Sequence, residues 1–290
     1  MRFIQSLYKK LRLHRWDLAI ILPEDFGKDL GVSHAHFVFN PYKNKWFADP
    51  FILYIDKDTI EVLVEEFDKK LKRGRIARLS ISKRTYSILS MKVILDLETH
   101  LSFPAIRRMG NDIFIYPENS ASGSLSLYRY DYTKDEIKFS GTLVYNPLTD
   151  AIMYDKDGSH LIFATELPTP NGNILKVYSS IDGTMPYNFS YDIIFDSNIA
   201  RNGGDFFDYY GLPSRPAQIC IGGYGMGLSL QTLEYDEKRY SFRELKRILP
   251  PKGYTGLHTY NQYQGYGIID CRCYVHQNLL SLLHRIKHLI

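Results

Sequence analysis

The sequence predicts an all-β protein: a five-bladed β-propeller with short amphipathic helices at both termini. First, a short polar signature opens an apolar run five times, at intervals of roughly fifty residues, as expected for four-stranded blades. Second, the runs within each unit have strand patterns. Third, five such units use nearly all of the 290 residues. The signatures are Ala48-Asp49-Pro50-Phe51, Ser102-Phe103-Pro104-Ala105, Thr149-Asp150-Ala151-Ile152, Ser214-Arg215-Pro216-Ala217-Gln218 and Leu257-His258-Thr259-Tyr260-Asn261.

The first three units share a second landmark, a glutamate that ends the second apolar run. A third run in each unit alternates apolar and polar residues, which is typical of a half-buried strand. A fourth run fits the outer strand, and turn-forming residues separate the runs. The glutamates are Glu66, Glu118 and Glu166; the third runs cover residues 74–79, 124–130 and 173–178, and the fourth runs 86–95, 137–145 and 191–195.

The ring must close between the two ends of the chain. The run Asp17-Leu18-Ala19-Ile20-Ile21-Leu22 has a strand pattern before the first unit, and we expect it to complete the last blade. The propeller domain is therefore predicted to span residues 17–275.

Both ends of the chain have the pattern of basic amphipathic helices, over residues 1–16 and 276–290. Such helices can lie on an anionic membrane surface. Alternatively, they pack against the propeller or in a dimer.

Composition excludes several classes of function. The net charge of +4 comes without a dense Lys/Arg stripe, so no nucleic-acid partner is expected. Three cysteines do not make a disulfide framework, and Cys271 and Cys273 lack a second ligand pair at zinc spacing, so neither metal nor cofactor is expected. Without a secretory signal or a run long enough to span a membrane, the expected location is the cytoplasm, with possible contact with the inner membrane face.

A propeller brings the innermost strands of all blades to one axis, so residues far apart in the sequence can share a pocket. We expect Asp49, Asp150, Arg215 and His258 to meet there. Paired carboxylates are what cleavage or formation of a glycosidic bond needs, because one activates the incoming hydroxyl and the other assists the departing group. Glu66, Glu118 and Glu166 are a second ring of candidates, or else repeated strand caps.

The remaining candidates would bind substrate. Arg215 can pair with a phosphate or carboxylate of a ligand, or with Asp49 or Asp150 of the chain itself. Histidine at an inner strand can carry a proton, bind a sugar hydroxyl, or simply be hydrogen-bonded. The predicted binding set is Glu66, His100, Arg215, Gln218, His258, Tyr260 and Asn261.

The ordered series Phe-Ala-Asp-Pro-Phe, Val-Glu-Glu, His-Leu-Ser-Phe-Pro, Arg-Pro-Ala-Gln and His-Thr-Tyr-Asn, between about residues 40 and 275, resembles one domain family. It is the N-terminal domain of plant glucosamine inositolphosphorylceramide transferases, which also occurs as stand-alone bacterial proteins. That family is similar to the five-bladed propellers of glycoside hydrolase family 43.

The resemblance implies that Asp49 is the general base, that a second Asp tunes the acid, and that a Glu is the acid. Ser102-Phe103-Pro104 stands where the hydrolases carry the second Asp, and Asp150 can take its place. The acid is then Glu118 or Glu166. In the plant proteins the transferase chemistry resides in a separate domain, which leaves a glycan-binding module open.

The sequence thus favours a carbohydrate-active propeller that acts at a glycosidic centre, in a glycosyl-transfer step of cytoplasmic surface-glycan synthesis. The substrate would be a sugar, an activated sugar or a lipid-linked glycan. A furanosidase-type glycoside hydrolase and a non-catalytic glycan-binding module are the alternatives.

Overall fold

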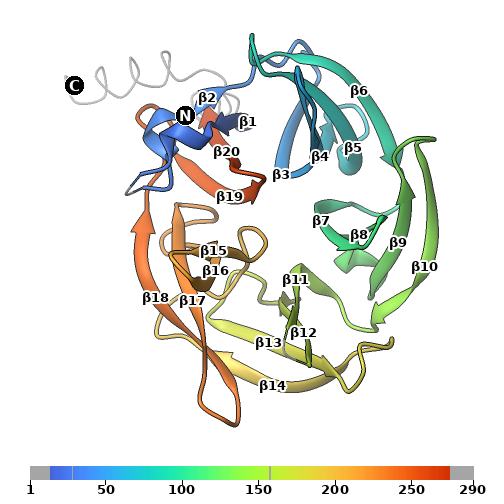
Figure 1. Cartoon of the computed structure of the whole chain (residues 1–290), viewed down its shortest axis with the longest axis vertical. Helices are drawn as coiled ribbons and strands as arrows, with labels where there is room; N and C mark the ends of the chain where they lie inside the picture. Colours follow the sequence, from blue (N-terminus) through green and yellow to red (C-terminus); the bar gives the residue numbers. More distant parts are fainter. Residues whose placement is uncertain (1–13, 28, 157, 275–290) are drawn as a thin grey trace, which may run out of the picture.

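The computed structural model describes residues 14–27, 29–156 and 158–274. Five four-stranded antiparallel sheets surround a central axis, as in a five-bladed propeller (Figure 1). Among the described residues, helical structure is limited to three short 3-10 turns, η1 (Pro23–Asp25), η2 (Val32–His34) and η3 (Ser120–Ser122), and no helix is long and apolar enough to cross a membrane.

The first four blades follow one another along the chain. Blade 1 contains β3 (Lys45–Ile55), β4 (Thr59–Asp68), β5 (Arg73–Ser82) and β6 (Ile88–Leu95), and blade 2 contains β7 (Ser102–Met109), β8 (Asp112–Glu118), β9 (Leu125–Asp131) and β10 (Glu136–Val144). Blade 3 contains β11 (Leu148–Lys156), β12 (Ser159–Glu166), β13 (Ile174–Ser180) and β14 (Asn188–Ile194). Blade 4 contains β15 (Phe207–Tyr209), β16 (Leu212–Gln218), β17 (Leu228–Tyr235) and β18 (Tyr240–Ile248).

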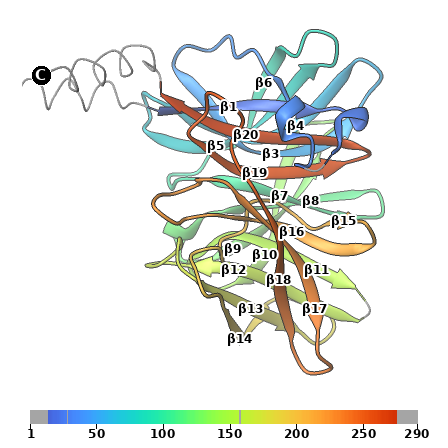
Figure 2. The same cartoon turned by 90° about the vertical axis from the view of Figure 1, so that its left-hand side faces the viewer.

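Blade 5 combines the two ends of the chain, which confirms the predicted ring closure. Its strand order is β19 (Gly256–Tyr263), β20 (Tyr266–Tyr274), β1 (His14–Ile21) and β2 (His36–Phe37). Strand β1 pairs with β20 from His14 opposite Tyr274 to Ile21 opposite Gly267, and the two strands lie side by side in Figure 2. The first and last described residues are therefore neighbours.

The predicted terminal helices receive no support. Residues 14–16 of the first one belong to strand β1, because they pair with residues 272–274 of β20. Residues 1–13 and 275–290 lie outside the described part of the chain.

Apolar side chains between adjacent blades form the core. Phe51 of blade 1 and Phe103 of blade 2 meet edge to face, with ring centroids 5.0 Å apart. Both rings are buried. Burial of each such side chain contributes roughly 1.5–3 kcal/mol, which holds neighbouring blades in a fixed relation around the axis.

A β-bulge repeats in the inner strands of blades 1, 2 and 3. Its left-handed residue is Asp49 (φ 49°), Phe103 (φ 45°) and Asp150 (φ 44°), and the strand register shifts at each position. Positive φ is uncommon in non-glycine residues, and a bulge re-aims the side chain that it carries. The blade-2 residue equivalent to Asp49 is therefore Phe103, not Ser102.

Blade 4 differs from the prediction. Arg215 was expected to open its innermost strand, but it lies on β16, the second strand. The inner position belongs to the segment before β15, where Asn202 bridges to Ala217. A side chain on Gly204 would come within 2.0 Å of the Tyr260 carbonyl oxygen, so glycine is required at this close approach to blade 5.

Candidate functional site

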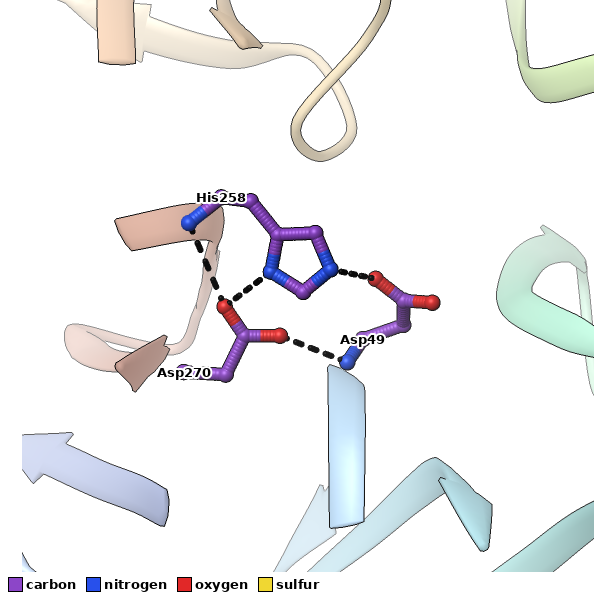
Figure 3. Close-up of side chains that lie close together, drawn as sticks. All are labelled: Asp49, His258 and Asp270. Atoms are coloured by element: carbon purple, nitrogen blue, oxygen red, sulfur yellow. Dashed lines mark hydrogen bonds and ion pairs between the residues drawn. The ribbon is translucent and has the colours of Figure 1, made fainter. Parts of the chain in front are cut away.

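The centre of the propeller contains a hydrogen-bonded triad of Asp49, His258 and Asp270 (Figure 3). His258 Nδ1 lies 2.6 Å from Asp270 Oδ1, and His258 Nε2 lies 3.3 Å from Asp49 Oδ1. The Asp49 backbone N–H donates to Asp270 Oδ2 at 2.8 Å. Burial lowers the pKa of His258, but the carboxylates of Asp270 and Asp49 outweigh it and raise that pKa above its ordinary value. The imidazole thus bridges two carboxylates from blades 1 and 5.

Each carboxylate oxygen of Asp49 has a further donor. Thr259 Oγ1 donates to Oδ1 at 2.9 Å, and the Phe103 N–H donates to Oδ2 at 3.1 Å. Burial nevertheless raises the pKa of Asp49 to about 6. Asp49 therefore changes its protonation state near neutral pH.

A second cluster surrounds Asp150. Arg201 Nε donates to Asp150 Oδ2 at 2.6 Å, and Gln218 Nε2 donates to the same oxygen at 2.7 Å. Glu118 Oε2 accepts from Arg201 at 3.2 Å and from the Asp150 N–H at 3.1 Å. Asp150 is buried, but the guanidinium of Arg201 holds its pKa below the ordinary value. Burial and the neighbouring Asp150 charge raise the pKa of Glu118 well above its ordinary value.

The two clusters lie within electrostatic reach of each other. After burial and the opposing effect of His258, the Asp150 charge contributes to the raised pKa of Asp49. The Asp49 charge in turn adds to the effects of burial and Asp150 on Glu118. The structure thus brings five predicted residues together at the propeller axis: Asp49, Glu118, Asp150, Gln218 and His258. We call this place, with the side chains that contact these five, the axial site.

Aromatic side chains cover the triad. Trp16 stacks on His258 with ring centroids 3.8 Å apart, and Tyr224 meets the same imidazole edge to face at 5.3 Å. The Arg201 guanidinium lies 5.2 Å from the centroid of the Tyr224 ring. Under this cover the side chains of His258 and Asp49 are only 2% and 5% exposed. Electrostatic interactions in such a water-poor site are stronger than at the surface.

Three buried oxygens at the ends of second strands have no hydrogen-bond partner among the described residues. They are Glu65 Oε1 on β4, Asn119 Oδ1 just after β8, and Gln218 Oε1 at the end of β16. His100 Nε2 lies 3.3 Å from Glu65 Oε1, without hydrogen-bond alignment. Because unpaired buried acceptors are costly, these oxygens suit a ligand rich in hydroxyl donors.

Two of the predicted glutamates lie away from the axial site. Glu66 is buried between Lys45 and Arg75, and its Oε2 accepts from Arg75 Nε at 2.8 Å. Glu166 accepts from Asn146 at 2.9 Å and lies 3.4 Å from Lys176. Successive strand residues point to opposite faces, so the axial position on β4 belongs to Glu65. For Glu66 and Glu166 the strand-end role is the one the contacts support.

Arg215 also lies away from the axial site. Its guanidinium is buried within blade 4, where it donates to the Ala200 carbonyl at 3.0 Å and to Gln231 Oε1 at 2.7 Å. It lies 4.2 Å from the centroid of the Phe242 ring. It makes no ion pair with a described carboxylate, and burial lowers its pKa to about 9. Arg201 is the arginine that meets Asp150.

Of the other predicted binding residues, His100 lies at the rim, and Tyr260 and Asn261 make contacts between strands. His100 is partly exposed at the rim, and its Nδ1 accepts from the Gly74 N–H at 2.9 Å. Asn261 Nδ2 donates to the Pro50 carbonyl at 2.8 Å, and Asn261 Oδ1 accepts from the Asp205 N–H at 2.8 Å. The Tyr260 ring is buried 5.5 Å from that of Phe207. Asn261 and Tyr260 therefore connect strands rather than line the axial site.

Five residues at the axial site were not predicted: Trp16, Glu65, Arg201, Tyr224 and Asp270. Asp270 follows the apolar run Ile268-Ile269, just as Glu65 follows the apolar run of residues 60–64 in blade 1. This parallel was available in the sequence. Arg201 precedes Gly203 and Gly204, the glycines that mark the inner segment of blade 4. Trp16 and Tyr224 reach the site from a neighbouring strand and a loop, and no local pattern identifies them.

The triad also has the composition of a metal site, since its potential ligand atoms lie within 4.8 Å of one another. A metal would have to displace the hydrogen bond from His258 to Asp270 and the contact to Asp49. Carboxylate–imidazole hydrogen bonds already satisfy these atoms, so we assign no metal to them.

The chain resembles part of three plant proteins described as glucosamine inositolphosphorylceramide transferase 1. The protein from Oryza sativa subsp. japonica is 30% identical over 229 residues, which cover 72% of this chain and 30% of that protein. The protein from Arabidopsis thaliana is 26% identical over 222 residues, covering 74% of this chain and 29% of that protein. The match thus spans less than a third of the relatives' length.

Solved structures share the propeller architecture at low sequence identity. A thermostable family-43 glycoside hydrolase has a TM-score of 0.53 at 10% identity, over 70% of this chain and 76% of that chain. A family-43 β-xylosidase/α-arabinofuranosidase from a compost microbial metagenome has a TM-score of 0.52 at 11% identity, over 80% of this chain and 91% of that chain. At this identity the likeness shows the fold alone.

The family described as "Glucosamine inositolphosphorylceramide transferase 1, N-terminal" matches residues 32–263, which include all of the axial residues except Trp16 and Asp270. Because the match covers most of the chain and the plant relatives agree with it, the chain belongs to this family of N-terminal domains.

Proposed function

We propose that this chain acts at a glycosidic centre, in a glycosyl-transfer step of surface-glycan synthesis on the cytoplasmic side of a membrane. The observation that carries the proposal is a group of three neighbouring buried carboxyls whose surroundings shift their pKa values in different directions. The pKa of Asp49 is raised to about 6, that of Glu118 is raised well above its ordinary value, and that of Asp150 is lowered. Carboxyls whose pKa values are pushed apart are typical of acid–base pairs.

The proposed roles follow from these protonation states. Asp49, ionised above about pH 6, accepts the proton of the incoming hydroxyl group. At the same time the oxygen of that hydroxyl group bonds to the anomeric carbon. Glu118, whose pKa is raised well above its ordinary value, gives its proton to the departing oxygen as the old glycosidic bond breaks. Asp150 stays ionised beside Arg201 and, through its charge, keeps the proton on Glu118.

The buried surroundings favour an acceptor sugar over water as the incoming group. Trp16 and Tyr224 cover the triad, which limits entry of water. The unpaired oxygens of Glu65, Asn119 and Gln218 can accept hydrogen bonds from sugar hydroxyls. A lipid-linked glycan or an activated sugar is the proposed substrate, in line with the names of the plant relatives.

Two alternatives have their own support. In a furanosidase-type hydrolase the same carboxyls would activate water, and the family-43 neighbours have this architecture. In a non-catalytic glycan-binding module the carboxyls would only bind hydroxyls. The full set of donors on both Asp49 oxygens favours that second alternative over hydrolysis.

Turnover of a panel of aryl furanosides, aryl pyranosides and nucleotide sugars separates the three functions. Transfer predicts product only when an acceptor glycan is added, and a loss of about 10²–10⁴-fold in Asp49→Asn and Glu118→Gln. Glu166→Gln, a half-buried strand-end variant outside the axial site, is the matched control and should keep its rate. Release of sugar to water without acceptor would show hydrolysis. Glycan binding that survives Asp49→Asn and Asp150→Asn, with no turnover, would show a binding module.

A further inference from the structure

A groove lies between blades 5 and 1, outside the axial site. Its cavity has a volume of about 490 Å³. We call it the rim groove, and its principal lining residues are Arg15, Phe37, Phe39, Lys43, Lys69 and Tyr254. Nothing in the proposed reaction uses these side chains.

The rim groove is rich in positive charge that the protein does not neutralise. Lys69 Nζ donates to the Lys43 carbonyl at 3.2 Å, and neither lysine forms an ion pair with a carboxylate in the described part of the chain. Arg15 pairs with Asp17 at 2.9 Å. Lys45, at the back of the cavity, is held by Glu66 and Asp68. Lys43 and Lys69 are therefore available to an anion.

Exposed aromatic rings stand beside these cations. Phe37 and Tyr254 stack with centroids 4.4 Å apart and nearly parallel rings. Phe39 is 67% exposed, and Leu71 of the hairpin after Lys69 is 48% exposed. Basic side chains next to exposed aromatic and aliphatic groups are typical of surfaces that lie at a lipid headgroup layer.

Hydrogen bonds to the backbone hold the groove in shape. The Tyr42 N–H donates to Asn40 Oδ1 at 2.8 Å, and Asn40 Nδ2 donates to the Lys45 carbonyl at 3.1 Å. The Lys69 N–H donates to the Asn44 carbonyl at 3.0 Å. The loop that carries Lys43 is thus tied to the β4–β5 hairpin, and the two lysines need little reorganisation to bind a ligand.

The rim groove and the axial site are built on the same strands. Arg15 lines the groove, and the next residue, Trp16, covers His258. On β3, Lys45 of the groove precedes Asp49 by four residues, about 13 Å along a strand. His14, next to Arg15 of the groove, pairs with Tyr274, so the first and last described residues lie together at this edge of blade 5.

We infer that the rim groove binds the phosphate headgroup of an anionic membrane lipid. Lys43 and Lys69 contact the phosphate, while Phe39 enters the headgroup layer. The binding itself is independent of the proposed function; only its consequence, an axial site held close to a membrane-bound glycan, rests on that function. The sequences of residues 1–13 and 275–290 are also basic, and basic segments add attraction to an anionic surface.

The test is partition of the full chain onto vesicles of phosphatidylcholine with and without phosphatidylglycerol. Each Lys near an anionic surface is worth about 1 kcal/mol, so Lys43→Gln with Lys69→Gln should weaken partition about thirty-fold. The matched control is Lys156→Gln with Lys238→Gln, the same change of charge at the last residue of β11 and in the hairpin between β17 and β18, neither of which lines the groove. The control should lose much less, and Phe39→Ser should weaken partition onto the vesicles that contain phosphatidylglycerol.

Three results would overturn the inference: equal partition of the groove and control variants, partition that does not need phosphatidylglycerol, or binding of soluble glycerophosphate as tight as that of vesicles. Thermal unfolding of each variant shows whether it is folded. Turnover of soluble aryl glycosides or nucleotide sugars should be unchanged in the groove variant. Conversely, vesicle binding should be unchanged in Asp49→Asn, so failure of one proposal is distinguishable from failure of the other.

Discussion

Replacement of Arg201 by methionine should destabilise the fold in a pH-dependent way. The change removes the cation that contacts Asp150 at 2.6 Å and Glu118 at 3.2 Å, and leaves Asp150 as a buried, unpaired carboxylate. Loss of one partner of a buried ion pair costs about 3–5 kcal/mol. We expect the full loss in Arg201→Met at pH 8. At that pH Asp150 is ionised in the unfolded chain, so the variant must either bury an unpaired charge on folding or take up a proton at a large cost in free energy.

The magnitude at lower pH follows from the cost of protonating Asp150. Above the ordinary pKa of 3.8, each pH unit adds about 1.36 kcal/mol to that cost, which is about 5.7 kcal/mol at pH 8 and about 1.6 kcal/mol at pH 5. Protonation limits the penalty, so the loss in Arg201→Met should shrink by about 1.4–3.4 kcal/mol between pH 8 and pH 5. The sign agrees with the wild type, in which the lowered pKa of Asp150 contributes stability that is present above pH 3.8 and lost on acidification.

Urea unfolding followed by tryptophan fluorescence measures this difference, with Arg243→Met as the control. Arg243 pairs with Glu234 at the surface, where both side chains are about half exposed, so its removal should cost less than about 1 kcal/mol at either pH. A penalty for Arg201→Met that is equal at pH 5 and pH 8, or as small as that of Arg243→Met, would refute the electrostatic account of the axial site.

Three further predictions concern the same site. The kcat/KM of the wild type should rise with pH through about 6, as Asp49 loses its proton, and a flat profile from pH 5 to pH 8 would argue against Asp49 as the base. Trp16→Ala should cost about 3–5 kcal/mol in urea unfolding and shift products from transfer toward hydrolysis, whereas an unchanged product ratio would mean that the cover does not exclude water. Arg215→Met should destabilise the fold by about 2–4 kcal/mol, because Asn202 and Gln231 lose their donor, yet leave the pH profile in place; a shifted profile would return Arg215 to the axial site.

The fold was predictable because its signal is periodic. The recurring signatures and the strand pattern at Asp17–Leu22 lie in short stretches of sequence, and burial of one sheet face dictates such patterns. Asp49, Asp150 and His258 could be placed at the axis from this repeat alone. The terminal helices were inferred from amphipathic spacing, and at residues 14–16 pairing with β20 determines the structure instead.

The rest of the site could not be predicted from local pattern. The bulge at Phe103 shifts the equivalent position by one residue from Ser102, and a shift of one residue on a strand reverses the side of the sheet. For the same reason the side chains of the adjacent residues Glu65 and Glu66 lie on opposite faces of their sheet. Arg201 and Arg215 differ by their place in blade 4, which depends on the pairing of Asn202 with Ala217. These are long-range contacts that a sequence repeat does not encode.

The position of a bound sugar tests the central claim most directly. A crystal structure of the Asp49→Asn chain with a donor sugar that the wild type turns over should show the sugar at the axis. We expect its hydroxyls within hydrogen-bond distance of Glu65, Glu118 or Gln218, and its anomeric carbon beside residue 49. A sugar bound only on the outer strands, with the axial side chains still hydrogen-bonded to one another, would contradict the account.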